Sequence, residues 1–322
     1  MYQHTLNQRV KYRKIINISR MIKRNYFDET TPIPIILHPS WLGQKQKGVS
    51  LSPYLIKTQF QKNQFFHNYY KPHTLQYRYP QVQYLNSGAK NEDLVEDLEN
   101  LYKVNASINA PRINIGGDHS MSIATLAYTL NKYPDAKVLW IDAHPDLNTY
   151  EESDSKNVHG MPLSFLSQLD KHYSNKFSFI KNPLCLDNLL YMGIRSIDDY
   201  EKEIIKKYNI SYIPSNIANK HTEESICIIK NFVHNSPLHL SLDVDSLSSD
   251  IMPCTGTPVE EGIRFVQLQR IIDHISAMEN LVNVDIVELN VIDGEHNIST
   301  KTGCLEKTTL IFQNILRNMS KL

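Results

Sequence analysis

The sequence predicts an α/β fold with a single doubly wound, mostly parallel sheet and helices on both faces. Short apolar runs, typical of strands buried on both faces, alternate with stretches of helical periodicity. Neither an internal repeat nor a linker interrupts this alternation after residue 33. Hydrophobic residues make up 41% of the 322 residues and charged residues 21%, which are ordinary globular values. This composition excludes a disordered or fibrous protein.

The first strand is predicted at Ile33–Leu37, an apolar run that Pro32 and Pro34 frame. Similar apolar runs predict five further strands: Ile113–Ile115, Val138–Ile141, Leu189–Met192, Leu238–Leu242 and Val284–Leu289. Helical character is found at Met121–Leu130, Pro162–Leu169, Tyr200–Tyr208, Glu223–Phe232, Phe265–Met278 and Leu305–Met319. Alternation of this kind indicates βαβ units, whose strands are parallel.

Two parts of the chain differ in charge. We expect a basic N-terminal extension over residues 1–32 and one folded domain over residues 33–322. The first 27 residues hold seven Lys and Arg and no acid, and their isoleucines fall at helical spacing. They resemble a mitochondrial targeting peptide, with a flexible basic tail as the alternative. We therefore expect an intracellular protein, in the cytosol or the mitochondrial matrix.

The formal net charge is zero, but residues 1–91 carry 14 Lys and Arg against two acids, and the remainder carries 20 against 32. The acidic part favours a cationic ligand. Aromatic and basic residues are interleaved over residues 54–85, and core aromatics beside a solvated face explain them better than a nucleic-acid surface. The sequence contains no run of 18 apolar residues, so it predicts no membrane-spanning helix. The four cysteines form no C-x-x-C pair, and we expect buried thiols in a reducing compartment.

Three predicted strands are followed directly by metal-ligand residues, and ligands of such sheets bind at the carboxyl ends of the strands. These ends deliver two His and four Asp: His119, Asp142, His144, Asp146, Asp243 and Asp245. Because alternate residues of an extended segment point the same way, Asp142, His144 and Asp146 converge. Four neighbouring carboxylates are costly to bury unless cations neutralise them. The sequence therefore predicts a pair of divalent ions, with Mn²⁺ favoured by the oxygen-rich ligands and a metal-activated water as nucleophile.

Three segments carry a family resemblance: Gly116–Ser120, Asp142–Thr149 and Ser241–Asp245. In order and separation they resemble the three metal motifs of the ureohydrolase family, and the resemblance extends over residues 33–320. It implies an arginase-like three-layer fold and a binuclear manganese centre that hydrolyses a guanidino group. It further implies that His119, Asp142, Asp146 and Asp243 hold one ion, and that His144, Asp142, Asp243 and Asp245 hold the other.

The segment after the second motif resembles the arginase version rather than that of other members. The resemblance implies that Asn148, Ser155 and Asn157 bind a substrate α-carboxylate, and that Asp198 and Glu201 bind its α-amino group. Thr257 matches a residue that lines the metal cleft. Two residues match catalytic positions: His159 a proton shuttle, and Glu288 the partner of the guanidinium.

The expected activity is hydrolysis of L-arginine to L-ornithine and urea by a homotrimer or hexamer, with no membrane or nucleic-acid partner. Two alternatives remain open. One is another ureohydrolase, such as an agmatinase or a guanidino-acid hydrolase. The other is a catalytically inactive, metal-bound scaffold.

Overall fold

The computed structural model describes residues 32–70, 82–87, 93–171 and 175–321. The predicted basic extension, apart from Pro32, lies outside the described residues, and so does the proposed targeting peptide. No helix among the described residues has the length and apolar character required to cross a membrane.

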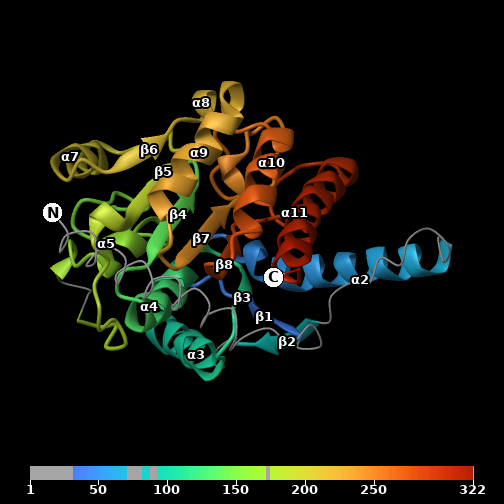
Figure 1. Cartoon of the computed structure of the whole chain (residues 1–322), viewed down its shortest axis with the longest axis horizontal. Coiled ribbons are helices and arrows are strands. Elements are labelled where there is room, and N and C mark those ends of the chain that lie inside the picture. Colours follow the sequence, from blue (N-terminus) through green and yellow to red (C-terminus); the bar gives the residue numbers. More distant parts are fainter. Residues whose placement is uncertain (1–31, 71–81, 88–92, 172–174, 322) are drawn as a thin grey trace, which may run out of the picture.

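Eight parallel strands form one sheet in the order β2-β1-β3-β8-β7-β4-β5-β6 (Figure 1). The strands are β1 (Ile33–His38), β2 (Val82–Asn86), β3 (Arg112–Gly116), β4 (Lys137–Ile141), β5 (Leu189–Met192), β6 (Ser211–Ile213), β7 (Leu238–Asp243) and β8 (Leu281–Val287). The predicted parallel α/β sheet is thus confirmed, and all six predicted strands are present.

Helices cover both faces of the sheet, as the sequence predicts (Figure 1). The longer ones are α2 (Ser52–Tyr70), α3 (Leu94–Ser107), α4 (Ser122–Lys132), α5 (Pro162–Leu166), α7 (Asp199–Lys207), α8 (Ser215–Lys220), α9 (Thr222–Val233), α10 (Phe265–Ser276) and α11 (Ile298–Met319). One apolar core joins the sheet to α2, α8, α9, α10 and α11. A second core joins the other face to α3, α4, α5 and α7.

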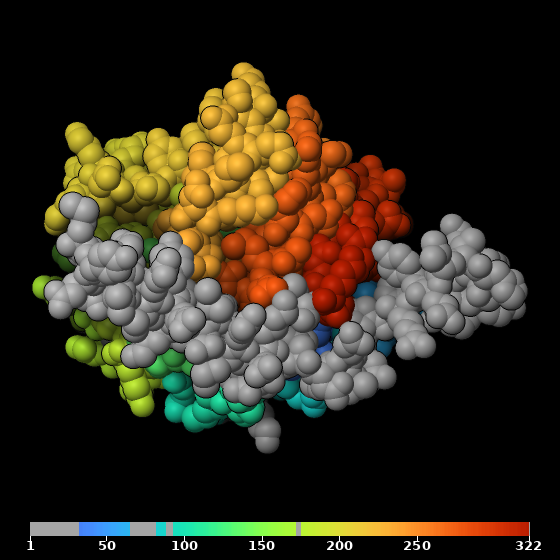
Figure 2. Space-filling model, in the orientation of Figure 1, coloured from blue at the N-terminus to red at the C-terminus, as the bar shows by residue number. Residues whose placement is uncertain are grey.

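The alternation of side chains along each strand feeds the two cores. In β4, Leu139 and Ile141 pack in the first core, whereas Val138 and Trp140 pack in the second. Strands buried on both faces are apolar throughout, which is why the sequence reveals them as continuous runs. Figure 2 shows the outer surfaces of α9, α10 and α11 side by side, in colours from yellow to red.

Several boundaries differ from prediction for local reasons. α5 ends at Leu166 rather than Leu169, and Gln168 takes a positive φ of 59° that a helix cannot contain. β8 runs over Leu281–Val287 instead of Val284–Leu289, and it ends where Glu288 turns to a φ of 67°. α11 begins seven residues earlier than predicted, where the Asn297 side chain accepts a hydrogen bond from the Thr300 amide.

Two other expectations are settled by burial. Of the cysteines, Cys254 and Cys304 are buried as expected, but Cys185 and Cys227 are exposed. The prediction was wrong for this pair because Cys185 precedes a surface turn and Cys227 lies on the outer side of α9. In the aromatic segment, Phe60 is buried and Tyr54 is 39% exposed. The aromatic side chains of residues 65–81 lie outside the described part of the chain, so the expectation for the whole segment stays a prediction.

The strand order determines where a site can form. β3 and β4 follow one another along the chain, but β8 and β7 lie between them in the sheet. The carboxyl ends of β3, β8, β7 and β4 are therefore neighbours. A crevice at such an edge is where open parallel sheets bind ligands.

Candidate metal centre and substrate pocket

The loops after β3, β4 and β7 bring the six predicted ligands to one edge of the sheet. His119 begins a short turn after β3, and it is 1% exposed. Asp142 follows β4 and turns the chain by accepting a hydrogen bond from the His144 amide at 2.7 Å. Asp243 ends β7 and accepts from the Asp245 amide at 2.7 Å. These local turns aim the side chains of each motif into one cluster.

His119 lies at the centre of the first part of the cluster. Its Nδ1 is 3.0 Å from an oxygen of Asp142, 3.0 Å from one of Asp146 and 3.5 Å from one of Asp243. Its ring stacks on Trp140 with centroids 4.1 Å apart, and the indole of Trp140 donates to Asp142 at 3.0 Å. The ring of His119 is therefore fixed with Nδ1 facing the three carboxylates.

His144 lies in the second part. Its Nδ1 is 3.1 Å from an oxygen of Asp245 and 3.6 Å from one of Asp142. Thr257, which is predicted to line the metal cleft, donates to Asp245 at 3.2 Å. Two groups could each hold a metal ion, namely His119 with Asp142 and Asp146, and His144 with Asp142 and Asp245. The two groups share Asp142.

The chemistry of this cluster fits bound cations. His119 Nδ1 is buried and has no hydrogen-bond partner among the described residues, although carboxylate oxygens lie 3.0 Å away. Burial and the charge of Asp142 raise the pKa of Asp146 to about 6. Burial together with Asp245 and Asp142 raises the pKa of Asp243 well above its ordinary value. An unpaired nitrogen among mutually repelling carboxylates is the donor set that a divalent ion relieves.

His159 and Glu288 form a buried pair beside the cluster. His159 Nδ1 lies 3.0 Å from Glu288 Oε1. Burial alone would lower the pKa of His159, but the charge and hydrogen bond of Glu288 outweigh it and raise that pKa to about 9. Glu288 also accepts from the His119 amide at 2.8 Å and from Gln44 at 2.7 Å. Both oxygens of Glu288 are thus occupied, Oε1 by His159 and the His119 amide and Oε2 by Gln44.

A pocket brings most of the other predicted residues together. Its lining includes two of the cluster aspartates, His144 and His159. Thr257 also lines it, together with the five residues predicted to bind substrate: Asn148, Ser155, Asn157, Asp198 and Glu201. The lining is polar on nearly every side. The pocket therefore opens from the His–Asp cluster toward hydroxyl, amide and carboxylate groups.

Asp198 and Glu201 are held by the start of α7. They form a capping box, in which the Glu201 side chain accepts from the Asp198 amide at 3.0 Å. Glu201 also accepts from the Leu147 amide, and Asp198 accepts from the Asn148 side chain at 2.8 Å. Burial raises the pKa of Glu201 to about 7. The helix start is thereby tied to the segment that follows the second motif.

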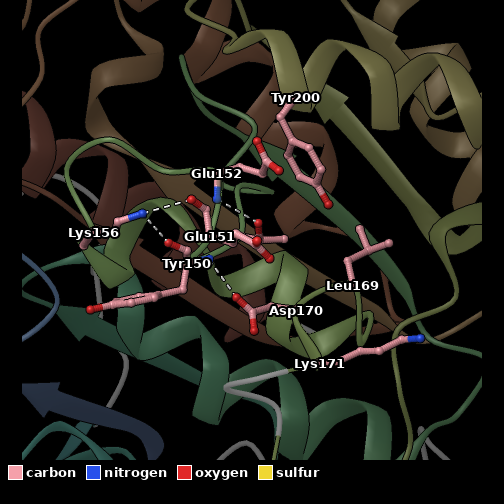
Figure 3. Close-up of a pocket in the computed structure, with 9 residues that line it drawn as sticks. Tyr150, Glu151, Glu152, Lys156, Leu169, Asp170, Lys171 and Tyr200 are labelled. Atoms are coloured by element: carbon pink, nitrogen blue, oxygen red, sulfur yellow. Dashed lines mark hydrogen bonds between the residues drawn. The ribbon is translucent and has the colours of Figure 1, made fainter.

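A second pocket, of about 680 Å³, is lined by residues 149–152 and by Lys156 of the segment that follows the second motif (Figure 3). There the Lys156 ammonium donates to the carbonyls of Tyr150 and Glu151, and Asp170 accepts from the Tyr150 amide at 2.7 Å. Tyr200 of α7 faces the same hollow. These contacts brace the segment that carries Ser155 and Asn157.

Several residues that support the site were not among the predicted ones. Gln44 holds Glu288, Trp140 holds His119 and Asp142, and Ser241 lies 2.7 Å from His119 Nε2. Each reaches the site from a distant part of the sequence or from a strand interior. Ser241 does interrupt an apolar strand, which is a signal that sequence reasoning could have used. Glu288 and Asp146 both take a positive φ, as residues at functional sites often do.

A parallel sheet with a His–Asp cluster at its strand ends, opening into a polar pocket, defines a candidate metal-dependent enzyme. The chain matches the Arginase family over residues 32–319 and belongs to that family. It is 34% identical over 230 residues to the arginase of Eremothecium gossypii, and 38% identical over 222 residues to that of Plasmodium berghei. These alignments cover 67% and 63% of this chain.

The same alignments span 57% of the Eremothecium gossypii protein and 63% of the Plasmodium berghei protein. Among solved structures, the chain is similar to Entamoeba histolytica arginase in complex with L-ornithine. The TM-score is 0.74 at 28% identity, over 87% of this chain and 98% of that one. The expected arginase-like fold is confirmed by this likeness.

Proposed function

We propose that this chain is an arginase, which hydrolyses L-arginine to L-ornithine and urea with two Mn²⁺ ions per subunit. The observation that carries the proposal is the pair of His–Asp groups sharing Asp142, open to a pocket lined by Thr257 and the five predicted substrate residues. The likeness to an arginase solved with L-ornithine supports the same substrate class.

Each ion has four candidate ligands. By resemblance, His119, Asp142, Asp146 and Asp243 would hold one, and His144, Asp142, Asp243 and Asp245 the other. The structure groups all of these except Asp243, which lies 3.5 Å from His119 Nδ1. Four carboxylates balance two divalent ions, and oxygen-rich ligands suit Mn²⁺. When bound, such ions lower the pKa of water and polarise the substrate, so that water can attack the guanidinium carbon.

The pocket residues suit the α-amino acid end of arginine. Asn148, Ser155 and Asn157 offer amide and hydroxyl donors to a carboxylate. Asp198 and Glu201 supply negative charge toward an ammonium group, and the capping box holds them in place before substrate arrives. An arginine bound this way would place its guanidinium toward the His–Asp cluster.

His159 is the proposed proton donor to the leaving amine. With its pKa at about 9, it carries a proton at neutral pH. Glu288 keeps that imidazolium in place through the 3.0 Å contact. A direct contact between Glu288 and the guanidinium would require Gln44 to give way, because Gln44 occupies Oε2.

The test is urea release after incubation with Mn²⁺, with L-arginine and agmatine assayed in parallel. We expect urea from L-arginine, loss of activity on chelation, and little urea from agmatine, which lacks the α-carboxylate. Asp142→Ala should lose both Mn²⁺ binding and urea release, because both metal groups use Asp142. Urea from agmatine alone would indicate another ureohydrolase, and bound Mn²⁺ without urea would indicate an inactive scaffold.

By resemblance we also propose a homotrimer or hexamer, which light scattering would measure. The basic composition of the first 27 residues supports import into mitochondria or residence in the cytosol. A fluorescent fusion with and without those residues would distinguish the two compartments.

A further inference from the structure

Behind the candidate metal centre, a line of buried polar groups leads away from His119. His119 Nε2 lies 2.7 Å from Ser241 Oγ on β7. Ser241 Oγ lies 3.4 Å from Ser122 Oγ at the start of α4, and Ser122 donates to Asp285 Oδ2 of β8 at 2.8 Å. All four side chains are at most 1% exposed. Because these groups are shielded from water, each needs a hydrogen-bond partner within the protein.

Asp285 is a fixed acceptor at the far end. Burial would raise its pKa, but the adjacent His239 and the hydroxyls of Thr125 and Ser122 outweigh burial and hold that pKa below its ordinary value. Asp285 also accepts from the Asn114 side chain at 2.8 Å and lies 3.1 Å from His239. An ionised carboxylate can accept hydrogen bonds but cannot donate them.

This fixed acceptor determines the direction of each hydrogen bond. The single proton of the Ser122 hydroxyl is used on Asp285, so Ser122 can only accept from Ser241. When Ser241 donates its single proton across the 3.4 Å to Ser122, it accepts from His119 Nε2 at 2.7 Å. A neutral imidazole with its proton on Nε2 has a lone pair on Nδ1. That is the nitrogen that faces Asp142 and Asp146.

We propose that Asp285, acting through the hydroxyls of Ser122 and Ser241, is a positioning residue that keeps the Nδ1 lone pair of His119 ready to bind a metal ion. The inference rests on the metal centre of the proposed function and does not depend on the substrate. It assigns a role to buried residues that touch neither the pocket nor the carboxylate cluster.

The chain offers a matched pair of variants on the same helix. Ser122→Ala removes the link between Asp285 and Ser241. Thr125→Val also removes one hydroxyl from Asp285 Oδ2, a bond of 2.5 Å, but Thr125 is not on the line to His119. Both changes remove one buried hydrogen bond to the same oxygen, so a general loss of stability should affect them alike.

The experiment titrates Mn²⁺ into chelator-treated protein and follows free Mn²⁺ by electron paramagnetic resonance. We expect wild type to bind two ions. Ser241→Ala should weaken one of them by about 10–100-fold, the usual effect of losing an outer partner of a histidine ligand. Ser122→Ala should weaken the same ion by a smaller factor, whereas Thr125→Val should bind both ions like wild type. Thermal unfolding of the metal-free variants measures the structural effect separately.

Two results would overturn the inference. One is wild-type Mn²⁺ affinity in Ser241→Ala, and the other is equal weakening in Ser122→Ala and Thr125→Val. A wild-type chain that binds Mn²⁺ but releases no urea would contradict the proposed function only, because the comparison of affinities would still decide the inference. A wild-type chain that binds no Mn²⁺ would contradict both.

Discussion

In the pair of His159 and Glu288, burial and a neighbouring charge act in opposite directions on the pKa of the imidazole. Burial disfavours a charged imidazole, yet the carboxylate 3.0 Å away reverses that effect and raises the pKa from 6.5 to about 9. Because the folded-state pKa is raised, the pair's stabilisation is fully present below about pH 6.5. It is lost as the pH rises through about 9.

We therefore expect His159→Gln to remove part of the pH dependence of stability in metal-free protein. Between pH 6 and pH 9.5, the free energy of unfolding of wild type should fall, relative to the variant, by at most about 3 kcal/mol. Urea denaturation at several pH values measures this difference. His221→Gln is the control, because it makes the same substitution in a His–Glu pair that is largely exposed. Parallel curves for His159→Gln and wild type would show that the pair does not stabilise the fold.

Under the proposed function, single residues of the pocket select the substrate. We expect Asn157→Ala to raise the KM for L-arginine about tenfold, since a hydrogen bond to a charged group is lost. The low activity expected toward agmatine, which has no α-carboxylate, should not change. Glu151→Gln is the control: it changes a charge on the same segment, but Glu151 lines the second pocket, so the KM for L-arginine should stay that of wild type. Equal effects of Asn157→Ala on both substrates would contradict the assigned role.

At the level of elements, the loop before α2 supports the site through Gly43. Its amide donates to Asp118 at 2.8 Å, and its carbonyl accepts from the His159 amide at 3.1 Å. A Cβ on this glycine would lie 2.6 Å from Asp118 Oδ1 and 2.7 Å from Ser120 Cβ. The loop and the turn after β3 therefore pack without room for a side chain.

Gly43→Ala should destabilise the protein by about 1–3 kcal/mol, the usual cost of overpacking. It should also lower kcat, because the segment with His159 must shift. Gly160→Ala is the matched control for stability, since nothing lies within 4 Å of its added Cβ. Thermal unfolding and urea release report the two effects. A Gly43→Ala melting temperature equal to that of Gly160→Ala would show that the loop adapts.

Strands were predictable from the sequence where all or nearly all residues of the strand are buried. The six central strands appear as apolar runs, whereas β2 and β6 lie at the sheet edges with exposed positions and have no such run. α3 was missed although its signal is present, with Asp93 as the N-cap before a helix whose buried positions include Leu98 and Leu101. The boundaries at Gln168 and Glu288 depend on backbone turns that tertiary contacts impose.

The whole molecule explains why the candidate metal-ligand cluster was predictable and the residues that support it were not. The candidate ligands follow three strand ends, and a parallel sheet must bring such ends to one edge. Gln44 and Ser241 contact the site because the sheet places β1, β3, β8 and β7 in adjacent order, with the loops above them. No local pattern specifies contacts across 244 residues, such as that of Gln44 with Glu288.

The same architecture gathers four buried carboxylates, and this makes the metal-free fold less stable than it could be. The raised pKa of Asp243 means that its charge is disfavoured in the folded state at neutral pH. Asp243→Asn removes that charge, and its amide oxygen can still accept from the Asp245 amide. We expect the metal-free variant to be more stable than wild type by about 1–2 kcal/mol, as in other trade-offs between stability and function.

Bound Mn²⁺ should instead make wild type more stable than Asp243→Asn. At 100 times its dissociation constant, Mn²⁺ would stabilise wild type by about 3 kcal/mol per ion, and the variant should lose most of that gain with its weakened site. Thermal unfolding with chelator measures the stability of each metal-free protein, and thermal unfolding with Mn²⁺ measures the stabilisation by the metal. Asp250→Asn, an exposed aspartate beside Arg264, should respond to Mn²⁺ like wild type. If Asp243→Asn is less stable than wild type without metal, the carboxylates do not repel one another, and the electrostatic case for a cation at this edge of the sheet fails.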